Sequence, residues 1–202
     1  QRPPYRQRKL GGILAAFAIA LCTPALAHAS YAEREDARAF AAEIASRHAL
    51  DAGEIERALA GARHDPEVIR LITPPSRKGV RSWRSYRARF LDRTRIDGGM
   101  RFWHEHADTL ERAERETGVP AEVIVAIIGV ETIYGRNTGN FETLSTLATL
   151  AFDYPPRAEL FRRELEALFL LAREQGRDPA SYYGSFAGAL GYPQFLPSSM
   201  RA

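Results

Sequence analysis

The chain has 202 residues, of which 45% are hydrophobic, so it is long enough to bury the core of one domain. Its 28 basic and 25 acidic residues give a net charge of +3. Four of the basic residues are Arg2, Arg6, Arg8 and Lys9, and without them 24 basic side chains face 25 acidic ones. The positive charge therefore belongs to the N-terminal tail, and the near-neutral remainder argues against a nucleic-acid-binding protein.

The N-terminal tail, residues 1–29, has the three parts of a secretory signal peptide. Its basic start is followed by the uncharged apolar run Ile13–Leu21, which is too short to span a bilayer because that takes about 20 residues. Ala25-Leu26-Ala27 and Ala27-His28-Ala29 both offer the small-x-small pattern of a cleavage site. We therefore predict a cleaved signal and a periplasmic protein. The alternative is a buried core helix or an uncleaved anchor.

The only cysteine, Cys22, follows Leu21, where a lipid-attachment site would need a small residue. We therefore expect a soluble exported protein whose mature part has neither a disulfide nor a thiol nucleophile. The chain starts at Gln1 rather than Met and stops at Ala202 without a terminating signal, so we expect a fragment. Residues 30–202 would form one incomplete, monomeric domain.

Helical spacing of apolar residues begins directly after this segment. Helices are predicted over Glu33–His48, Glu54–Gly61 and Glu67–Ile72, the last with Pro66 at its first position. The paired Pro74-Pro75 ends this group, because proline cannot continue a helix. The face of the first helix that we expect to be buried comprises Ala37, Phe40, Ala41, Ile44 and Ala45.

A basic, aromatic stretch follows over Arg77–Arg95. Arginines among aromatics are also typical of a nucleic-acid surface, but the near-neutral charge favours a solvated helix with its aromatics in the core. Gly98-Gly99 is expected to interrupt the chain before an amphipathic helix over Met100–Thr117. His104 and His106 are two residues apart and point to different helix faces, so they predict no metal site. The aromatics are Trp83, Tyr86 and Phe90.

Two more helices are predicted over Thr143–Phe152 and Arg157–Gln175, and a glycine-rich region begins at Gly184. No segment has the alternating pattern of a long strand, and no repeat is present. The fold is therefore predicted to be mainly α.

The segment Ala121–Tyr134 (AEVIVAIIGVETIY) carries the strongest chemical signal. Val123–Val130 is apolar or small on every face, so we predict a central, buried helix with Glu131 at its C-terminal end. Desolvation and the negative end of the helix dipole would disfavour the ionised carboxylate, as a general acid requires. The alternative is a glutamate that emerges into solvent where the helix ends, and this helix alone leaves both open.

The glycine-rich segment Ser185–Ser199 (SFAGALGYPQFLPSS) could form a ligand cleft. Glycines let the backbone approach a ligand closely. Tyr192 and Phe195 could stack on sugar faces, and Gln194 could hydrogen-bond hydroxyl or amide groups. A loop before a helix capped by Ser198 would have a similar composition, so this segment is weak evidence by itself.

Four motifs together resemble the membrane-bound lytic murein transglycosylase B family and cover roughly residues 77 to 202. The first surrounds Glu131, and the other three follow it in the family's order. They are Ile128-Gly129-Val130-Glu131-Thr132 with Gly135-Arg136, Ala148–Pro155 (ATLAFDYP), Ser185–Ala189 (SFAGA) and Gln194–Ser199 (QFLPSS).

This resemblance implies a lysozyme-like catalytic core, truncated at its C-terminus, in a peptidoglycan lytic transglycosylase. Such an enzyme cleaves the β-1,4 bond between N-acetylmuramic acid and N-acetylglucosamine and forms a 1,6-anhydro sugar. Glu131 would be the single catalytic acid and then the base. A second carboxylate, as in ordinary glycosidases, is not needed, so we interpret Glu142 and Asp153 as a turn cap and a surface charge. Substrate binding is assigned to Ser185, Gln194, Tyr86, Tyr192 and Phe195.

The sequence also departs from the family pattern. Ile133-Tyr134 replaces an Arg-Trp pair, and the family's later segments, with their calcium-binding loop, lie beyond this chain. The chemistry requires no cofactor, no residue present is assigned to a metal, and the resemblance allows structural calcium only in the missing C-terminal part. The expected partners are peptidoglycan strands and proteins of wall synthesis or division. A lysozyme-type hydrolase and a non-catalytic wall-binding scaffold remain as alternatives.

Overall fold

The computed structural model describes residues 30–75 and 82–202. The expected signal segment, residues 1–29, and residues 76–81 of the basic stretch lie outside the described residues. Within those two ranges most residues are helical, and none of the helices has the length and apolar content for crossing a membrane. The elements, with η for 3₁₀ helices, are η1 Tyr31–Glu33, α1 Glu35–His48, α2 Ala52–Gly61, α3 Pro66–Ile72, α4 Trp83–Arg87, α5 Arg93–Glu105, α6 Ala107–Thr117, α7 Ala121–Thr132, β1 Phe141–Glu142, α8 Thr143–Asp153, η2 Pro155–Arg157, α9 Ala158–Gln175, η3 Pro179–Ser181, β2 Tyr183–Gly184 and α10 Pro197–Met200.

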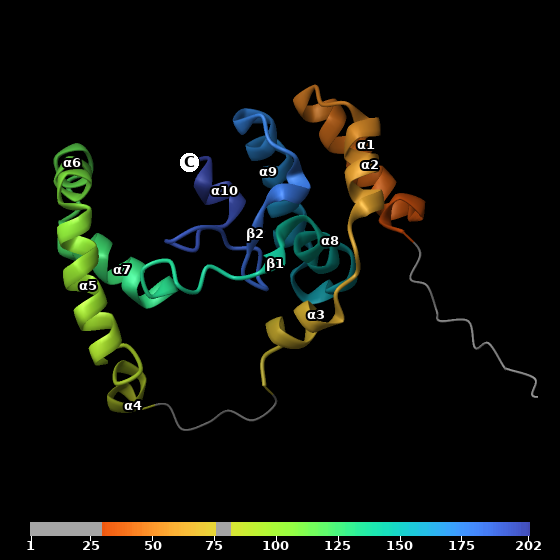
Figure 1. Cartoon of the computed structure of the whole chain (residues 1–202). Helices are drawn as coiled ribbons and strands as arrows, with labels where there is room; N and C mark the ends of the chain where they lie inside the picture. Colours follow the sequence, from red (N-terminus) through yellow and green to blue (C-terminus); the bar gives the residue numbers. More distant parts are fainter. Residues whose placement is uncertain (1–29, 76–81) are drawn as a thin grey trace, which may run out of the picture.

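The larger of two hydrophobic cores joins α1, α2 and α3 to α8 and α9 (Figure 1). The five residues predicted to form the inner face of α1 are all buried, so the helical spacing was read correctly. The central helix is α8, because every residue from Thr143 to Phe152 is buried. A hydroxyl group of α8 also holds the turn before α3, because Ser145 Oγ accepts a hydrogen bond from the backbone N–H of Arg63 at 2.9 Å. The only strands in the described ranges, β1 and β2, pair antiparallel beside this core.

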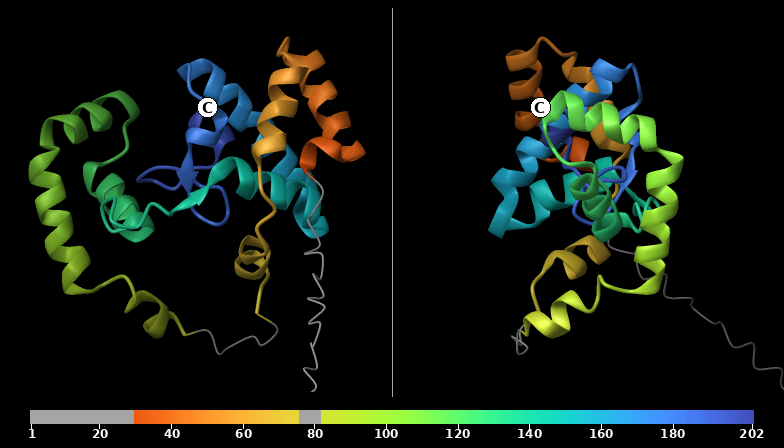
Figure 2. Two further views of the ribbon diagram at one scale, coloured as in Figure 1. Left: turned by 45° about the vertical axis from the view of Figure 1, so that its right-hand side comes forward. Right: turned by 90° about the vertical axis from the view of Figure 1, so that its left-hand side faces the viewer.

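The smaller core lies between α5, α6 and α7. Leu110, Ala121 and Val125 are buried there, with Phe102 and Tyr134 packed against them. In Figures 1 and 2 these helices stand apart from α1, α2, α8 and α9, and residues 133–140 lead from one group to the other. The position of α7, and with it Glu131, therefore depends on this connection.

The glycine pair Gly98-Gly99 does not interrupt the chain as expected, because both residues lie buried inside α5. A Cβ added to Gly98 would meet the Tyr134 ring at 2.8 Å, and one added to Gly99 would meet the Tyr134 hydroxyl at 2.6 Å. The two glycines thus make room for a side chain from another segment. The helix ends instead at Glu105, because His106 leaves the helical conformation with ψ at 22°.

The aromatic residues of α4 contradict their predicted place in the core. Trp83 and Tyr86 are 71% and 55% exposed. Their rings stack on each other with centroids 5.9 Å apart, and Tyr86 also contacts Phe90 at 5.1 Å. The three aromatic rings of this stretch therefore pack on one another rather than in either hydrophobic core.

Asp153 at the end of α8 anchors the N-terminal segment and is not the surface charge that we predicted. Its carboxylate accepts a hydrogen bond from the Tyr31 hydroxyl at 2.6 Å, lies 3.0 Å from Nδ1 of His64 and pairs with Arg34. Burial opposes ionisation of this carboxyl, but the hydrogen bonds from Tyr31, Arg34 and His64 outweigh it and hold the pKa of Asp153 below its ordinary value. The ionised carboxylate therefore stabilises the fold.

Replacing Asp153 with Asn should lower the free energy of unfolding by about 1–3 kcal/mol at pH 7, because the three partners lose a charged acceptor. With a lowered pKa in the folded state, the contribution is fully present above the pKa of the unfolded chain, about 4, and is lost as pH falls through the folded value. Urea unfolding at pH 7 and pH 3 should show the gap to the wild type narrowing in acid. Asp97→Asn, at an exposed site on α5, is the control. A gap independent of pH would contradict this prediction.

Candidate active site

Glu131 lies in the last turn of α7, and the chain turns sharply directly after it. The helix ends at Thr132, and Ile133 and Tyr134 then take positive φ angles of 52° and 57°, followed by Gly135 at 84°. A non-glycine residue adopts this left-handed conformation at a cost of about 1–2 kcal/mol. Contacts from other segments must therefore hold the turn that follows the carboxylate.

The buried hydroxyl of Thr132 is the first of these contacts. It accepts the backbone N–H of Gly135 at 3.0 Å, which closes the turn. Its proton lies between two carbonyl oxygens, Tyr192 O at 2.9 Å and Ile128 O at 3.2 Å. One side chain thus joins the end of α7, the turn after it and the glycine-rich segment. This link sets Glu131 against the predicted cleft residues.

Tyr134 and Arg95 fasten the same end of α7 to α5. The Tyr134 hydroxyl donates to Arg95 O at 3.0 Å, and Arg95 Nε donates to Gly129 O at 3.1 Å. The Tyr134 ring also packs so closely that a Cβ on Gly129 would meet its hydroxyl at 2.3 Å. Tyr134, noted in the sequence only as a departure from the family pattern, therefore has a positioning role.

Replacing Tyr134 with Phe should cost about 1 kcal/mol of stability, because only the hydrogen bond to Arg95 is lost. Tyr134→Ala should cost about 3 kcal/mol, because it also leaves a void between α5 and α7. Urea unfolding measures both values, and the phenylalanine variant serves as the control for ring packing. Equal losses in the two variants would contradict the assignment of the ring as the main support.

The glycine-rich segment folds back on itself through bridges between Gly184 and Leu190 and between Leu190 and Phe195. The Ser185 hydroxyl accepts the N–H of Ala189 at 3.2 Å within this fold. Gln194 has a positive φ of 53°, and its Nε2 donates to Thr138 O at 3.1 Å. Two predicted cleft residues are thus brought into one loop, and Gln194 ties that loop to the connection after α7.

The aromatic rings of this loop are open to solvent, as stacking on a sugar requires. Tyr192 is 48% and Phe195 46% exposed. The Tyr192 ring lies directly over Gly135, where an added Cβ would meet it at 2.4 Å. The ring therefore sits beside the turn that follows Glu131.

The surroundings of Glu131 differ from those predicted for a buried helix. Only one side of α7 is buried, with Ala121, Val125, Gly129 and Thr132 facing the smaller core. On the opposite side Val123, Ile127 and Val130 are 42%, 46% and 42% exposed, and Glu131 is exposed next to them. The described residues therefore provide an apolar stripe beside the carboxylate but do not cover it.

Tyr86 is not brought to the other predicted residues. It lies in α4, which precedes α5 at the far end of the smaller helical group (Figure 1). Its ring contacts are with Trp83 and Phe90. Its assignment to the cleft therefore rests on the sequence resemblance alone.

The remaining acidic and histidine residues form no second centre in the described ranges. Glu142 occupies the N-cap position of α8, but its side chain makes no capping hydrogen bond to the helix backbone, so the predicted cap is wrong; its carboxylate accepts a hydrogen bond from the Ser145 hydroxyl instead. Within residues 30–75 and 82–202, no three His, Cys, Asp or Glu side chains lie close enough together to hold a metal ion.

Three residues that position the site were not identified from the sequence, namely Arg95, Thr132 and Tyr134. A threonine in the last turn of an apolar helix is a weak signal, because its hydroxyl often bonds within its own helix. The buried glycines at 98, 99 and 129 were the better signal, since closely packed glycines indicate a large group lying over them.

Comparison with known proteins places this arrangement among enzymes of the bacterial wall. The model of a family described as the transglycosylase SLT domain matches residues 32–202. Membrane-bound lytic murein transglycosylase B of Escherichia coli (strain K12) is 40% identical over 180 residues, which are 85% of this chain and 50% of that protein. The chain therefore spans about half the length of the curated relative that it matches.

Solved structures agree with this match. The catenated lytic transglycosylase SltB1 from Pseudomonas aeruginosa superposes with a TM-score of 0.81 at 44% identity, over 85% of this chain and 56% of that one. SltB3 from the same organism, solved with NAG-NAM-pentapeptide and with NAG-anhNAM-pentapeptide, gives 0.74 at 30% identity, over 86% and 45%. Both structures therefore match most of this chain and about half of their own length.

Proposed function

The chain belongs to the transglycosylase SLT domain family, with a helical core like that of the lysozyme-like lytic transglycosylases. From this premise we propose that it is part of a peptidoglycan lytic transglycosylase. Its substrate would be the β-1,4 bond between N-acetylmuramic acid and N-acetylglucosamine, and its product a 1,6-anhydromuramic acid. The observation that carries the proposal is the family match through α7 and residues 184–199, the two segments that Thr132 joins.

The proposed chemistry uses one carboxyl group twice. Protonated Glu131 donates its proton to the glycosidic oxygen, and the bond from that oxygen to C1 of the muramic acid breaks. The carboxylate so formed takes the proton of the 6-hydroxyl while O6 attacks C1, which restores the acid and closes the anhydro ring. Neither water nor a cofactor is consumed. Asp153 and Glu142, the two candidates for a second carboxylate, already accept hydrogen bonds from Tyr31 and from Ser145.

The cleft residues would position the sugar for this intramolecular attack. Ser185 and Gln194 would hold the substituents of the muramic acid, and Tyr192 and Phe195 would stack on sugar faces. Bound glycan, or parts of the protein outside the described residues, would cover Val123, Ile127 and Val130 and exclude water from the reacting carbon. Tyr86 would contribute only if the strand extends toward α4.

The proposal includes export. The signal features of residues 1–29 and the E. coli relative, which is named as membrane-bound, both support a protein that meets the wall in the periplasm. A monomer acting on glycan strands, alone or beside wall-synthesis or division proteins, remains our expectation.

Mass spectrometry of muropeptides released from purified sacculi by the full-length protein tests the reaction. Products lighter by one water than reducing muropeptides would establish the transglycosylase. Reducing ends would establish a lysozyme-type hydrolase instead. Binding to sacculi without any release would indicate a wall-binding scaffold.

A further inference from the structure

A second polar cavity lies beside the proposed cleft, with a volume of about 400 Å³. It is formed where the turn between α2 and α3 faces the β1–β2 pair, and its walls include Arg63, His64, Asn140 and Tyr183. This volume falls within the range of ligand pockets, about 300–1,000 Å³. None of these residues belongs to the site assigned from the sequence.

The cavity shares its backbone with the proposed cleft. Tyr183 is followed by Gly184 and then by Ser185 of the glycine-rich loop. Gly139, which precedes Asn140, packs so closely on Gly184 that an added Cβ would lie 2.0 Å from its carbonyl oxygen. The cavity and the glycine-rich loop of the proposed cleft are therefore direct neighbours.

Most charged side chains of the cavity already have a hydrogen-bond or ion-pair partner within the described residues, but the Arg63 side chain does not. Asp65 caps α3 by accepting the N–H of Glu67 at 2.9 Å, and Glu142 accepts a hydrogen bond from Ser145. His64 is held by Asp153. The guanidinium of Arg63, by contrast, is exposed and makes no hydrogen bond or ion pair within residues 30–75 and 82–202.

The Arg63 backbone is nevertheless fixed. Its N–H donates to Ser145 Oγ at 2.9 Å, and its carbonyl accepts a hydrogen bond from Thr149 Oγ1 at 3.5 Å. Both partners belong to the buried helix α8. The backbone that carries the guanidinium is thus already ordered, so only the side chain has to be ordered on binding.

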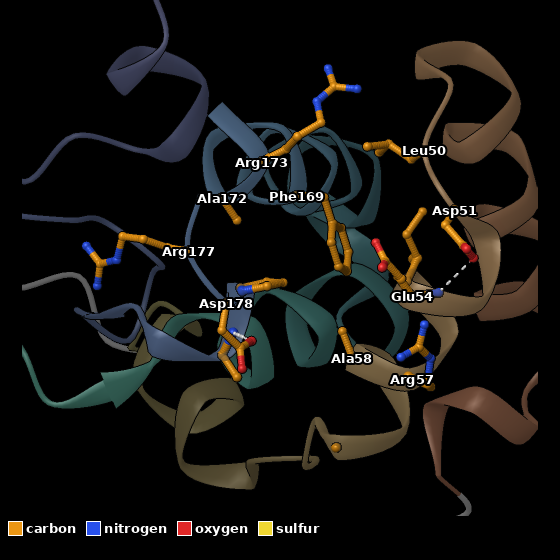
Figure 3. A pocket seen from close by; sticks show the side chains of 14 residues that line it. Leu50, Asp51, Glu54, Arg57, Ala58, Phe169, Ala172, Arg173, Arg177 and Asp178 are labelled. Atoms are coloured by element: carbon orange, nitrogen blue, oxygen red, sulfur yellow. Dashed lines mark hydrogen bonds between the residues drawn. The ribbon is translucent and has the colours of Figure 1, made fainter. Parts of the chain in front are cut away.

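A larger cavity offers a contrast. It measures about 570 Å³ and lies between α2 and α9 (Figure 3), with Phe169 at its centre. Each of its three arginines already donates to a backbone carbonyl, from Arg57 to Gly53, from Arg173 to His48 and from Arg177 to Ser181. It therefore has no free guanidinium for an anionic ligand.

We propose that the cavity at Arg63 binds a carboxylate of the peptide carried by the muramic acid. This inference rests on the proposed function. A guanidinium pairs bidentately with a carboxylate, the Asn140 amide can bond a peptide group, and the exposed Tyr183 ring, 59% accessible, can cover an aliphatic side chain. The site would make the protein prefer peptide-bearing glycan strands to bare ones.

The test is isothermal titration of the full-length protein carrying Glu131→Gln, which prevents turnover during the measurement. NAG-NAM-pentapeptide should bind more tightly than peptide-free NAG-NAM. Arg63→Gln should weaken the peptide-bearing ligand about tenfold, the loss of one charge-assisted hydrogen bond, and leave the bare disaccharide unchanged. Arg112→Gln, at an exposed site on α6, is the matched control and should change neither value.

An equal loss for both ligands, or no loss for the peptide-bearing one, would overturn the inference. Asn140→Ala provides a second variant that leaves the Arg63 backbone untouched, and it should also weaken only the peptide-bearing ligand. In another outcome, the wild-type protein releases anhydro products while the Arg63→Gln variant binds both ligands as tightly as the parent protein. That result would refute the peptide site and leave the proposed function standing. Failure of both ligands to bind would refute this site, while absence of anhydro products from sacculi would refute the proposed function.

Discussion

Replacing Glu131 with Gln should reduce release of anhydromuropeptides by the full-length protein at least about a thousandfold, because the amide has no acidic proton to transfer to the leaving oxygen. The substitution preserves shape, and the Glu131 side chain makes no hydrogen bond or ion pair within residues 30–75 and 82–202. The fold should therefore be unchanged. Muropeptide release from sacculi, quantified by mass spectrometry, measures the effect, and circular dichroism checks the fold.

Glu122→Gln is the matched control, since Glu122 is also an exposed glutamate on α7 but lies in its first turn. It should retain full turnover. Ser185→Ala and Gln194→Ala should lose less than Glu131→Gln, because they remove orientation rather than the proton source. Substantial turnover by the Glu131→Gln protein would refute the single-acid mechanism, whatever the cleft variants do.

How far the sequence predicts this fold depends on whether a helix has one apolar face or two. All five residues predicted to form the buried face of α1 are buried, because polar residues indicated its outer side. In α7 every face is apolar or small, so composition could not reveal which side packs against α5 and which stays open. In α8, by contrast, every residue from Thr143 to Phe152 is buried, although its threonines and serine are residues usually found at a surface.

The site shows the same division between local and long-range information. The motifs around Glu131 and in the loop at 185–199 were recognisable because they are contiguous in sequence. The hydrogen bond from Thr132 to Tyr192 spans 60 residues, and that from Tyr134 to Arg95 spans 39. A pattern in a single sequence does not indicate which distant residues form such hydrogen bonds. Asp153 was likewise misread, since its partners Tyr31, Arg34 and His64 all lie far away along the chain.

Gly139→Ala should have the largest effect on stability of any substitution considered, about 3 kcal/mol or more. Gly139 has a φ of +90°, and its missing Cβ would lie 2.0 Å from Gly184 O and 2.5 Å from Ser185 N. These are backbone atoms of β2 and of the residue directly after it, so no side chain can rotate away to relieve the clash. The connection after α7 would have to separate from the glycine-rich loop.

Gly176→Ala isolates the cost of the backbone conformation from the cost of the clash. Gly176 ends α9 with a φ of +61°, but a Cβ there would meet nothing within 4 Å. It should cost only about 1–2 kcal/mol, the penalty of a left-handed residue, and leave turnover intact. Gly139→Ala should also lose turnover in native conditions, because Ser185 would shift relative to Glu131. Equal losses of unfolding free energy in the two variants would mean that β1 and β2 can part freely. The close approach of Gly139 to Gly184 would then not be what holds the proposed acid against its cleft.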